Sequence, residues 1–133
     1  MSLIVKIDSP SGAGLSSEAI ELGRFLVRSG TGKTLAKAGA QAWAVGVAAN
    51  SAAAAGDDLK VYLPGQFCKV ECASAINASN GGQVPLGVDA DGKARAAVAG
   101  DRIVALLVAG EGESVAAGDL VTVRLTDGLE VHA

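Results

Sequence analysis

The amino-acid sequence predicts an all-β fold: a small antiparallel β-barrel or β-tulip-like sandwich with an extended N-terminal arm. Apolar runs of four to eight residues recur between turns that contain glycine or aspartate, as in barrels and sandwiches. Half of the 133 residues are hydrophobic, but only 3% are aromatic and 18 are glycine. The core must therefore consist mainly of small aliphatic side chains on a backbone rich in turns.

Seven strands are expected, in some of which polar and apolar residues alternate. In residues 59–63, Leu59, Val61 and Leu63 share one face, and residues 120–125 repeat this pattern. Residues 102–108 have no polar alternation after Arg102, which predicts a central strand covered on both faces. Two Ser- and Ala-rich stretches, residues 16–25 and 50–58, are too short for independent helices and are expected as loops or single turns. The expected strands are residues 3–7, 24–28, 43–48, 59–63, 67–73, 102–108 and 120–125.

Residues 29–34, with the sequence SGTGKT, raise the question of a phosphate-binding loop. The loop pattern G-x-x-x-x-G-K-[ST] would place its first glycine at position 27, which is Val27. Gly39 also interrupts the segment where the following helix should form. The stretch is better explained as a hairpin turn in which Gly30 and Gly32 adopt positive φ, between strands at residues 24–28 and 33–37.

Residues 88–94, VDADGKA, have some of the spacing of a calcium-binding loop. They lack its third acidic position, its bidentate glutamate and its flanking helices. Asp91-Gly92 between two strands instead predicts a second hairpin turn. One alternative remains, in which Lys93 is the acceptor lysine of a lipoyl- or biotinyl-type carrier hairpin.

The titratable residues do not assemble into a recognisable catalytic or metal-binding pattern. Cys68 and Cys72 lie four residues apart in an expected strand, about 13 Å, too far for a disulfide, and are predicted to be reduced and buried. His132 is the single histidine and is next to last in the chain, so neither a zinc site nor a nucleophile–histidine pair is expected. The sequence predicts a protein that is not an enzyme and has no cofactor, metal or small-molecule substrate.

Charge and hydropathy limit the classes of partner. The net charge is −3 and the pI is about 5.0, with scattered basic residues, which argues against a nucleic-acid partner. No apolar run approaches the ~18 residues of a membrane-spanning helix, and the first ten residues do not form a signal peptide. Synthesis in the cytoplasm and no membrane partner are expected.

The sequence contains an internal echo. Both halves have a turn with Gly-Lys, an apolar strand, a loop with Ala-Gly-Asp and an alternating strand, in that order. Gly32 and Gly92 lie 60 residues apart, and Gly56 and Gly118 lie 62 apart. The echo suggests two related hairpin units that together close one small barrel, with chance similarity between Ala- and Gly-rich segments as the alternative.

Two stretches resemble the capsid decoration (cement) proteins of tailed bacteriophages. Residues 43–73 contain the AVGV phrase, an Ala-rich loop, an alternating strand and a turn of the form G-x-F; residues 87–125 contain a DGK hairpin, an apolar strand and a closing GDLVTVRL strand. The resemblance implies a trimeric protein on the outer surface of a phage head, which binds the major capsid protein and stabilises contacts between shell subunits. A generic β-barrel interaction module is the competing interpretation.

The N-terminal segment is expected to attach the protein to its shell. Residues 1–22 are predicted as an arm and linker, and residues 23–133 as the β-barrel domain. Residues 3–7 have strand composition, but the Gly- and Ser-rich residues 9–17 are expected to separate them from the barrel as a flexible linker. Strand addition to a capsid subunit would bury the arm, and the alternative is a first strand of the same barrel or of a neighbour in the trimer. The candidate capsid-binding residues are Leu3, Ile4, Val5, Lys6 and Ile7.

Overall fold

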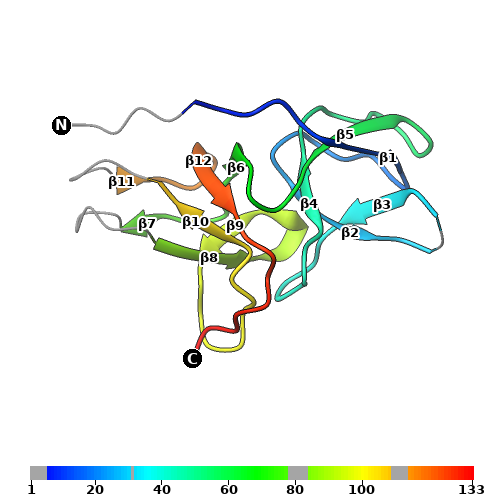
Figure 1. The fold of residues 1–133 in the computed structure, drawn as a ribbon. Coiled ribbons are helices and arrows are strands. Elements are labelled where there is room, and N and C mark those ends of the chain that lie inside the picture. The colour runs from blue at the N-terminus through cyan, green and yellow to red at the C-terminus, as the bar shows by residue number, and fades with distance from the viewer. Residues whose placement is uncertain (1–5, 31, 78–83, 109–113) are drawn as a thin grey trace.

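A computed structural model describes residues 6–30, 32–77, 84–108 and 114–133, and these residues form two five-stranded sheets that lie side by side (Figure 1). The first sheet closes into a barrel in the order β1-β3-β2-β4-β5, in which β5 pairs with β1. All its pairings are antiparallel except that of β1 with β3. Its strands are β1 (Gly12–Ser16), β2 (Phe25–Arg28), β3 (Thr34–Lys37), β4 (Gly46–Ala48) and β5 (Asp58–Tyr62).

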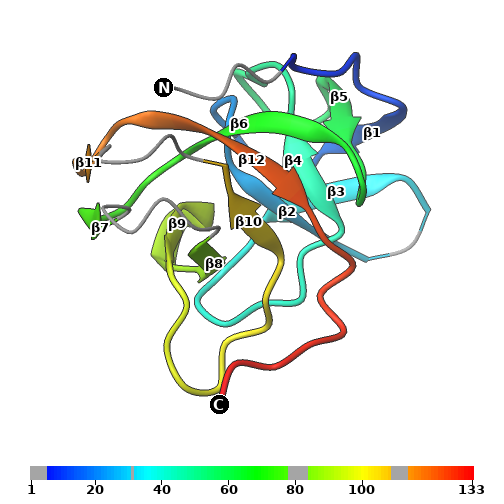
Figure 2. The ribbon, with the colours of Figure 1, turned by 60° about the vertical axis from the view of Figure 1, so that its left-hand side comes forward.

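The second sheet has the order β6-β12-β10-β8-β9 and is curled almost into a barrel. A single parallel bridge between Cys72 and Ala94 joins its two edges. Figure 2 shows β6 and β12 running together across this sheet, with β7 and β11 at its end remote from the first barrel. The elements are β6 (Phe67–Glu71), β7 (Ile76–Asn77), β8 (Val84–Val88), the 3-10 turn η1 (Ala90–Gly92), β9 (Ala94–Ala96), β10 (Ala105–Leu107), β11 (Ser114–Val115) and β12 (Leu120–Leu125).

The two sheets are duplicates of one another at the level of strand register. Replacing β1, β2, β3, β4 and β5 by β6, β8, β9, β10 and β12 converts the first strand order into the second, with the parallel contact in the same place. Leu15 pairs with Asp58 in the first barrel, and Glu71, 56 residues later, pairs with Leu120, 62 residues later. The register of every other strand pair agrees in the same way.

The turns before β5 and β12 repeat the same hydrogen bonds. The Asp57 carboxylate accepts from the N–H of Ala54 at 3.1 Å, and the Asp119 carboxylate accepts from the N–H of Ala116 at 3.0 Å. Gly56 and Gly118 donate to the carbonyls of Ser16 and Cys72, at 2.7 and 2.8 Å. The internal echo of the sequence therefore corresponds to a structural repeat. The expectation that the two units close one barrel together is wrong, because each unit curls into its own sheet.

Each barrel has an aliphatic interior, and the second interior continues onto the first barrel. The interior of the first barrel contains Ile20, Leu26, Leu35, Ala48, Ala52, Leu59 and Val61. Phe25 and Val47 come from the same strands as Leu26 and Ala48 but point to the other side, since side chains alternate along a strand. They are fully buried against the second barrel and belong to its core. The other members include Cys68, Val70, Leu86, Val88, Val104, Leu107, Val123 and Leu125.

Most expected strands are present, and both hairpin predictions are confirmed. β2 pairs antiparallel with β3, and β8 with β9. Gly30 and Gly32 have φ of 71° and 77°. Of residues 102–108, only Ala105–Leu107 form a strand, β10. This strand is central in its sheet, between β12 and β8, as predicted. It is not covered on both faces, because Leu106 is only half-buried. Two other expectations are wrong. The linker expected at residues 9–17 contains strand β1, at residues 12–16. The strand expected at residues 3–7 is not found at Lys6 and Ile7, which lie outside any strand.

Candidate functional site

The proposed capsid-binding residues lie at the start of the described chain or before it. Leu3, Ile4 and Val5 lie outside the described residues. Lys6 is exposed and Ile7 is half-buried. The attachment role of these residues stays a prediction.

The chain is fixed to the junction between the barrels directly after Ile7. Asp8 forms two hydrogen bonds with Phe67: its backbone N–H donates to the Phe67 carbonyl at 3.0 Å, and its carboxylate accepts from the Phe67 N–H at 2.8 Å. The Gln66 side chain donates to the Ser9 carbonyl at 2.7 Å and accepts from the Ser11 hydroxyl at 2.9 Å. Residues 8–16 are therefore part of the folded protein, which explains why the predicted flexible linker is absent.

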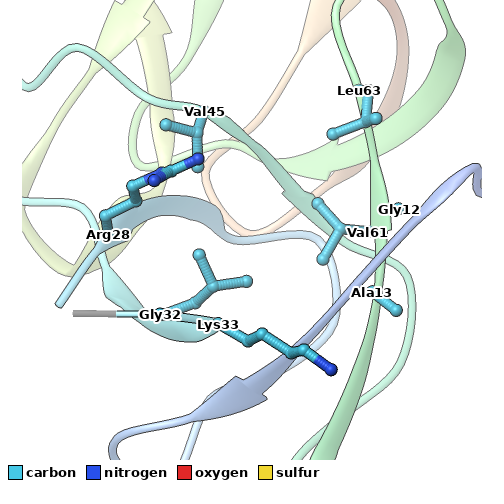
Figure 3. A pocket seen from close by; sticks show the side chains of 9 residues that line it. Gly12, Ala13, Arg28, Gly32, Lys33, Val45, Val61 and Leu63 are labelled. Carbon is cyan, nitrogen blue, oxygen red and sulfur yellow. The ribbon is translucent and has the colours of Figure 1, made fainter. Parts of the chain in front are cut away.

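The SGTGKT turn lies at the open end of the first barrel, here called the first mouth. Its hollow has a volume of about 410 Å³. Figure 3 shows Arg28 and Lys33, from the β2–β3 hairpin, facing Val61 and Leu63 of β5 and its continuation. In the described part of the chain neither basic side chain forms an ion pair. The first mouth is lined by Gly12, Ala13, Arg28, Gly32, Lys33, Leu35, Val45, Val61 and Leu63.

The equivalent end of the second barrel, the second mouth, is closed by the first barrel. Strand register assigns the counterparts of Arg28 and Leu63 as Val88 and Leu125 and, continued beyond the start of β9, makes Gly92 the counterpart of Lys33 rather than of Gly32. Val88 is fully buried, and Leu125 is 2% exposed. A Cβ on Gly92 would lie 2.9 Å from the Phe25 carbonyl oxygen, so a side chain there would collide with the first barrel. The first-barrel residues that cover this end include Phe25, Ala38, Ala44 and Val47.

Polar contacts orient the two barrels where their surfaces meet. The Arg24 guanidinium donates to the Asp91 carbonyl at 3.1 Å and pairs with Glu71 at 3.4 Å. The Lys93 ammonium pairs with the other oxygen of Glu71 at 3.2 Å. The hairpin that carries Lys93 is thus docked on the first barrel, whereas the acceptor lysine of a carrier protein has to reach its modifying enzyme.

A buried ion pair holds the loop between β9 and β10. Asp101 is fully buried and accepts from the Arg95 guanidinium at 2.8 and 3.1 Å and from the Val98 N–H at 3.1 Å. Burial opposes ionisation most strongly, but the hydrogen bonds from Arg95, Val98 and Gln41 outweigh it and lower the pKa of Asp101. The same hydrogen bond to Asp101 raises the pKa of Arg95.

The C-terminal segment, residues 127–132, pairs with that loop. Ile103 donates its N–H to the Glu130 carbonyl at 2.8 Å, and His132 donates to the Asp101 carbonyl at 2.8 Å. Trp43 donates to the Asp127 carbonyl at 2.6 Å, and the Arg102 guanidinium lies 3.9 Å from the centre of its indole ring. Leu129 and Val131 nevertheless remain 66% and 51% exposed, which leaves apolar surface available at this end of the molecule.

Groups that could support chemistry are buried or scattered. Cys68 and Cys72 are free and buried, as expected. Burial, with a smaller contribution from Asp8, raises the pKa of Cys68 to about 12. Burial, with Asp119 and Glu71, raises the pKa of Cys72 to about 11. Among the described residues no group of three His, Cys, Asp or Glu side chains could hold a metal ion. No helix in this part of the chain is long and apolar enough to cross a membrane.

The duplicated strand order and register define an all-β protein made of a closed five-stranded barrel and a second five-stranded sheet that is curled almost into a barrel. A solved structure has a similar fold over its full length: the N base of head fiber gp8.5 in bacteriophage phi29. The TM-score is 0.68, the sequence identity is 17%, and the alignment covers 100% of both chains. No protein-family model matches the sequence. The search of curated proteins also found no match.

Proposed function

We propose that this protein is a non-enzymatic structural component of a bacteriophage head and is located on the outer surface of the virion. The observation that carries the proposal is the similarity to the phi29 head fiber base along the whole of both chains. The resemblance of residues 43–73 and 87–125 to phage decoration proteins supports it from the sequence. Because fold alone does not define function, the proposal needs a test on phage heads.

Within this class, the proposed role is that of a capsid decoration (cement) protein. It binds the major capsid protein as a homotrimer and stabilises contacts between neighbouring shell subunits. The N-terminal residues Leu3 to Ile7 remain the candidate capsid-binding segment. Asp8 is compatible with this assignment, because its two hydrogen bonds to Phe67 fix the point on the barrel surface from which the preceding segment starts.

A second role is favoured by the same structural comparison: a base that attaches a projecting fibre to the head. The phi29 protein with the similar fold is the base of a head fiber. Both roles require binding to the shell, but only a cement protein has to strengthen it. Shell stability therefore distinguishes the two roles.

The test is to add the purified protein to heads assembled from the major capsid protein of the same phage. Bound protein is measured by co-sedimentation, and head stability by the temperature at which heads release DNA or lose shell subunits. Binding that raises this temperature supports the cement role, and binding without such a rise supports the fibre base. Failure of the folded protein to bind these heads overturns both.

A truncation tests the attachment segment. Deletion of residues 2–7 leaves Asp8 and its contacts with Phe67 intact, so the barrels should remain folded. The matched control replaces residues 2–7 with a Gly-Ser segment of the same length. We expect both variants to keep the wild-type circular dichroism spectrum and lose head binding. Wild-type binding by the truncated protein would show that the shell contacts lie elsewhere.

A further inference from the structure

The first mouth and the second mouth are equivalent ends of duplicated barrels, but only the second is covered. Most lining positions of the second mouth that strand register assigns are buried against the first barrel, including Cys68, Val88 and Val123, whereas Lys69, the counterpart of Ala13, is exposed. Of the counterparts in the first mouth, Arg28 is exposed, Gly12 is half-buried, and Leu63 is 36% exposed. The chain thus contains one docked mouth and one free mouth of the same construction.

The surface that covers the second mouth belongs to a specific face of the first barrel. This face, here called the tail face, consists of the outward sides of β2 and β4 and the loop between β3 and β4. Its central residues are Phe25, Ala38, Ala44 and Val47. Gln41 at its edge donates its N–H to the Val88 carbonyl at 3.0 Å. A barrel of this family of folds can therefore bind another through a contact between mouth and tail face.

The second barrel has a tail face of its own, and no mouth formed by the described residues covers it. The counterparts of Phe25, Ala38 and Val47 are Pro85, Ala97 and Leu106. Pro85, Ala97 and Leu106 are all half-buried. Val98 beside Ala97 is 47% exposed. The C-terminal segment, residues 127–132, extends this face along residues 100–103 and adds the exposed Leu129 and Val131.

The first mouth is basic, and the exposed end of the free tail face is acidic, since the nearby Arg102 cation lies against Trp43 and the Gly128 carbonyl. The first mouth carries Arg28 and Lys33 where the second mouth carries Val88 and Gly92, so the occupant of the first mouth has to accommodate two cations. Asp127 and Glu130, both exposed, flank Leu129 on the free tail face. Opposite charges around apolar side chains favour specific association and fix its register.

We propose that the first mouth binds the tail face of the second barrel of another copy of this chain. Leu129 and Val131 then lie against the apolar floor formed by Leu35, Val61 and Leu63, with the acidic side chains facing Arg28 and Lys33. Figure 1 shows the C-terminus at the bottom and the β2–β3 turn at the right, so the two surfaces meet only between chains. Such a head-to-tail contact closes into a ring or continues as a filament.

The inference deepens the homotrimer in the proposed function, because three chains joined this way would form a closed ring. It rests on the duplicated fold and not on attachment to a shell. Oligomeric state is therefore measured on the isolated protein, without heads. Loss of head binding in a protein that still oligomerises would overturn the attachment proposal and leave this inference intact.

The experiment reverses the charges of each surface and then of both. The mouth variant is Arg28→Glu with Lys33→Glu, and the tail variant is Asp127→Asn with Glu130→Lys. Asparagine at position 127 preserves an acceptor for the Leu129 N–H, which Asp127 binds at 3.0 Å. The control is Lys60→Glu with Lys69→Glu, the same change of charge as in the mouth variant at two exposed lysines that do not line the mouth. Circular dichroism checks that all variants are folded, and light scattering measures their mass.

We expect the wild type and the control to be oligomers of the same mass. Each charge-reversed variant should weaken self-association by about tenfold or more. The variant with all four substitutions should recover the oligomer, because its mouth and tail face are again complementary. A monomeric wild type at about 100 µM, wild-type mass in the mouth variant, or no recovery in the folded fourfold variant would each overturn the proposal.

Discussion

Arg95→Ala should destabilise the protein strongly at neutral pH, because it leaves the Asp101 carboxylate buried without its cation. Asp101 has no exposed surface, and the Arg95 side chain is 22% exposed. Removal of one partner of a buried ion pair costs about 3–5 kcal/mol. The Val98 N–H and Gln41 still hydrogen-bond the carboxylate in the variant, so the lower end, about 3 kcal/mol, is expected.

The corresponding fall in melting temperature follows from chain length. At about 2.1 cal/mol/K per residue, unfolding of 133 residues has an entropy of about 0.3 kcal/mol/K, so 3 kcal/mol lowers the midpoint by about 10 °C. Lys69→Ala is the control, since it removes a positive charge from an exposed position on β6. Its midpoint should lie within about 2 °C of the wild type.

The pH dependence separates this mechanism from a simple loss of packing. In the wild type the pKa of Asp101 is lowered, so the stability that the ionised carboxylate contributes is present above its unfolded pKa and is lost as the pH falls through the folded pKa. Without Arg95, burial favours the protonated carboxyl. The difference in melting temperature should therefore shrink below about pH 4. Equal melting temperatures of the wild type and Arg95→Ala at pH 7, or a difference between them that does not change with pH, would refute the reasoning.

The remaining predictions concern the mouths and the thiols. Gly92→Ala should lower the free energy of unfolding, measured by chemical denaturation, more than Gly30→Ala does. Both glycines have φ near 70°, but a Cβ at Gly92 would lie 2.9 Å from the Phe25 carbonyl oxygen, whereas a Cβ at Gly30 meets nothing within 4 Å. Equal losses in the two variants would contradict the packing at the second mouth. Cys68 and Cys72 should react with a thiol reagent at pH 8 at least 100-fold faster in denaturant than in the folded protein, since both are buried and their pKa values are about 12 and 11. Isothermal titration of ATP and magnesium should detect no binding in the wild type or in Lys33→Ala; binding that disappears in the variant would restore the phosphate-loop interpretation.

Local patterns in the sequence predict the strands and turns well, because alternation and turn chemistry act over a few residues. Gly30 and Gly32 in one hairpin and Asp91-Gly92 in the other mark turns that the structure contains. The sequence predicts β1 poorly. Residues 12–16 read as a linker because Gly12 and Gly14 have the composition of one, but the space that a Cβ at Gly14 would occupy is filled by Leu35 from β3. That compensation joins residues 21 positions apart and is visible only in the fold.

The candidate site was harder to predict, because its residues come together through the closure of the first barrel. Arg28 and Lys33 flank the turn that the sequence singles out, but nothing local connects them with Val61 and Leu63 across the hollow. The ion pair of Arg95 with Asp101 is not predictable from the sequence either, since an aspartate that directly follows a glycine is typical of a solvated turn. The internal echo was the one long-range signal available, and it pointed correctly to a repeat.

The residues at equivalent positions of the two mouths differ in a way that matches their burial: the second mouth is covered by the first barrel, and the first mouth is open. Where the second mouth packs against the first barrel, Val88 and Gly92 carry no charge, and the nearby Lys93 is paired with Glu71. Where the first mouth is open, the same positions carry Arg28 and Lys33. Burial of an unpaired charge in an interface costs free energy, whereas a charge on a surface open to water remains solvated. In the proposed contact the first mouth is covered only when a second chain binds, so it has to remain soluble alone and select an acidic partner. Two cations around an apolar hollow meet both requirements.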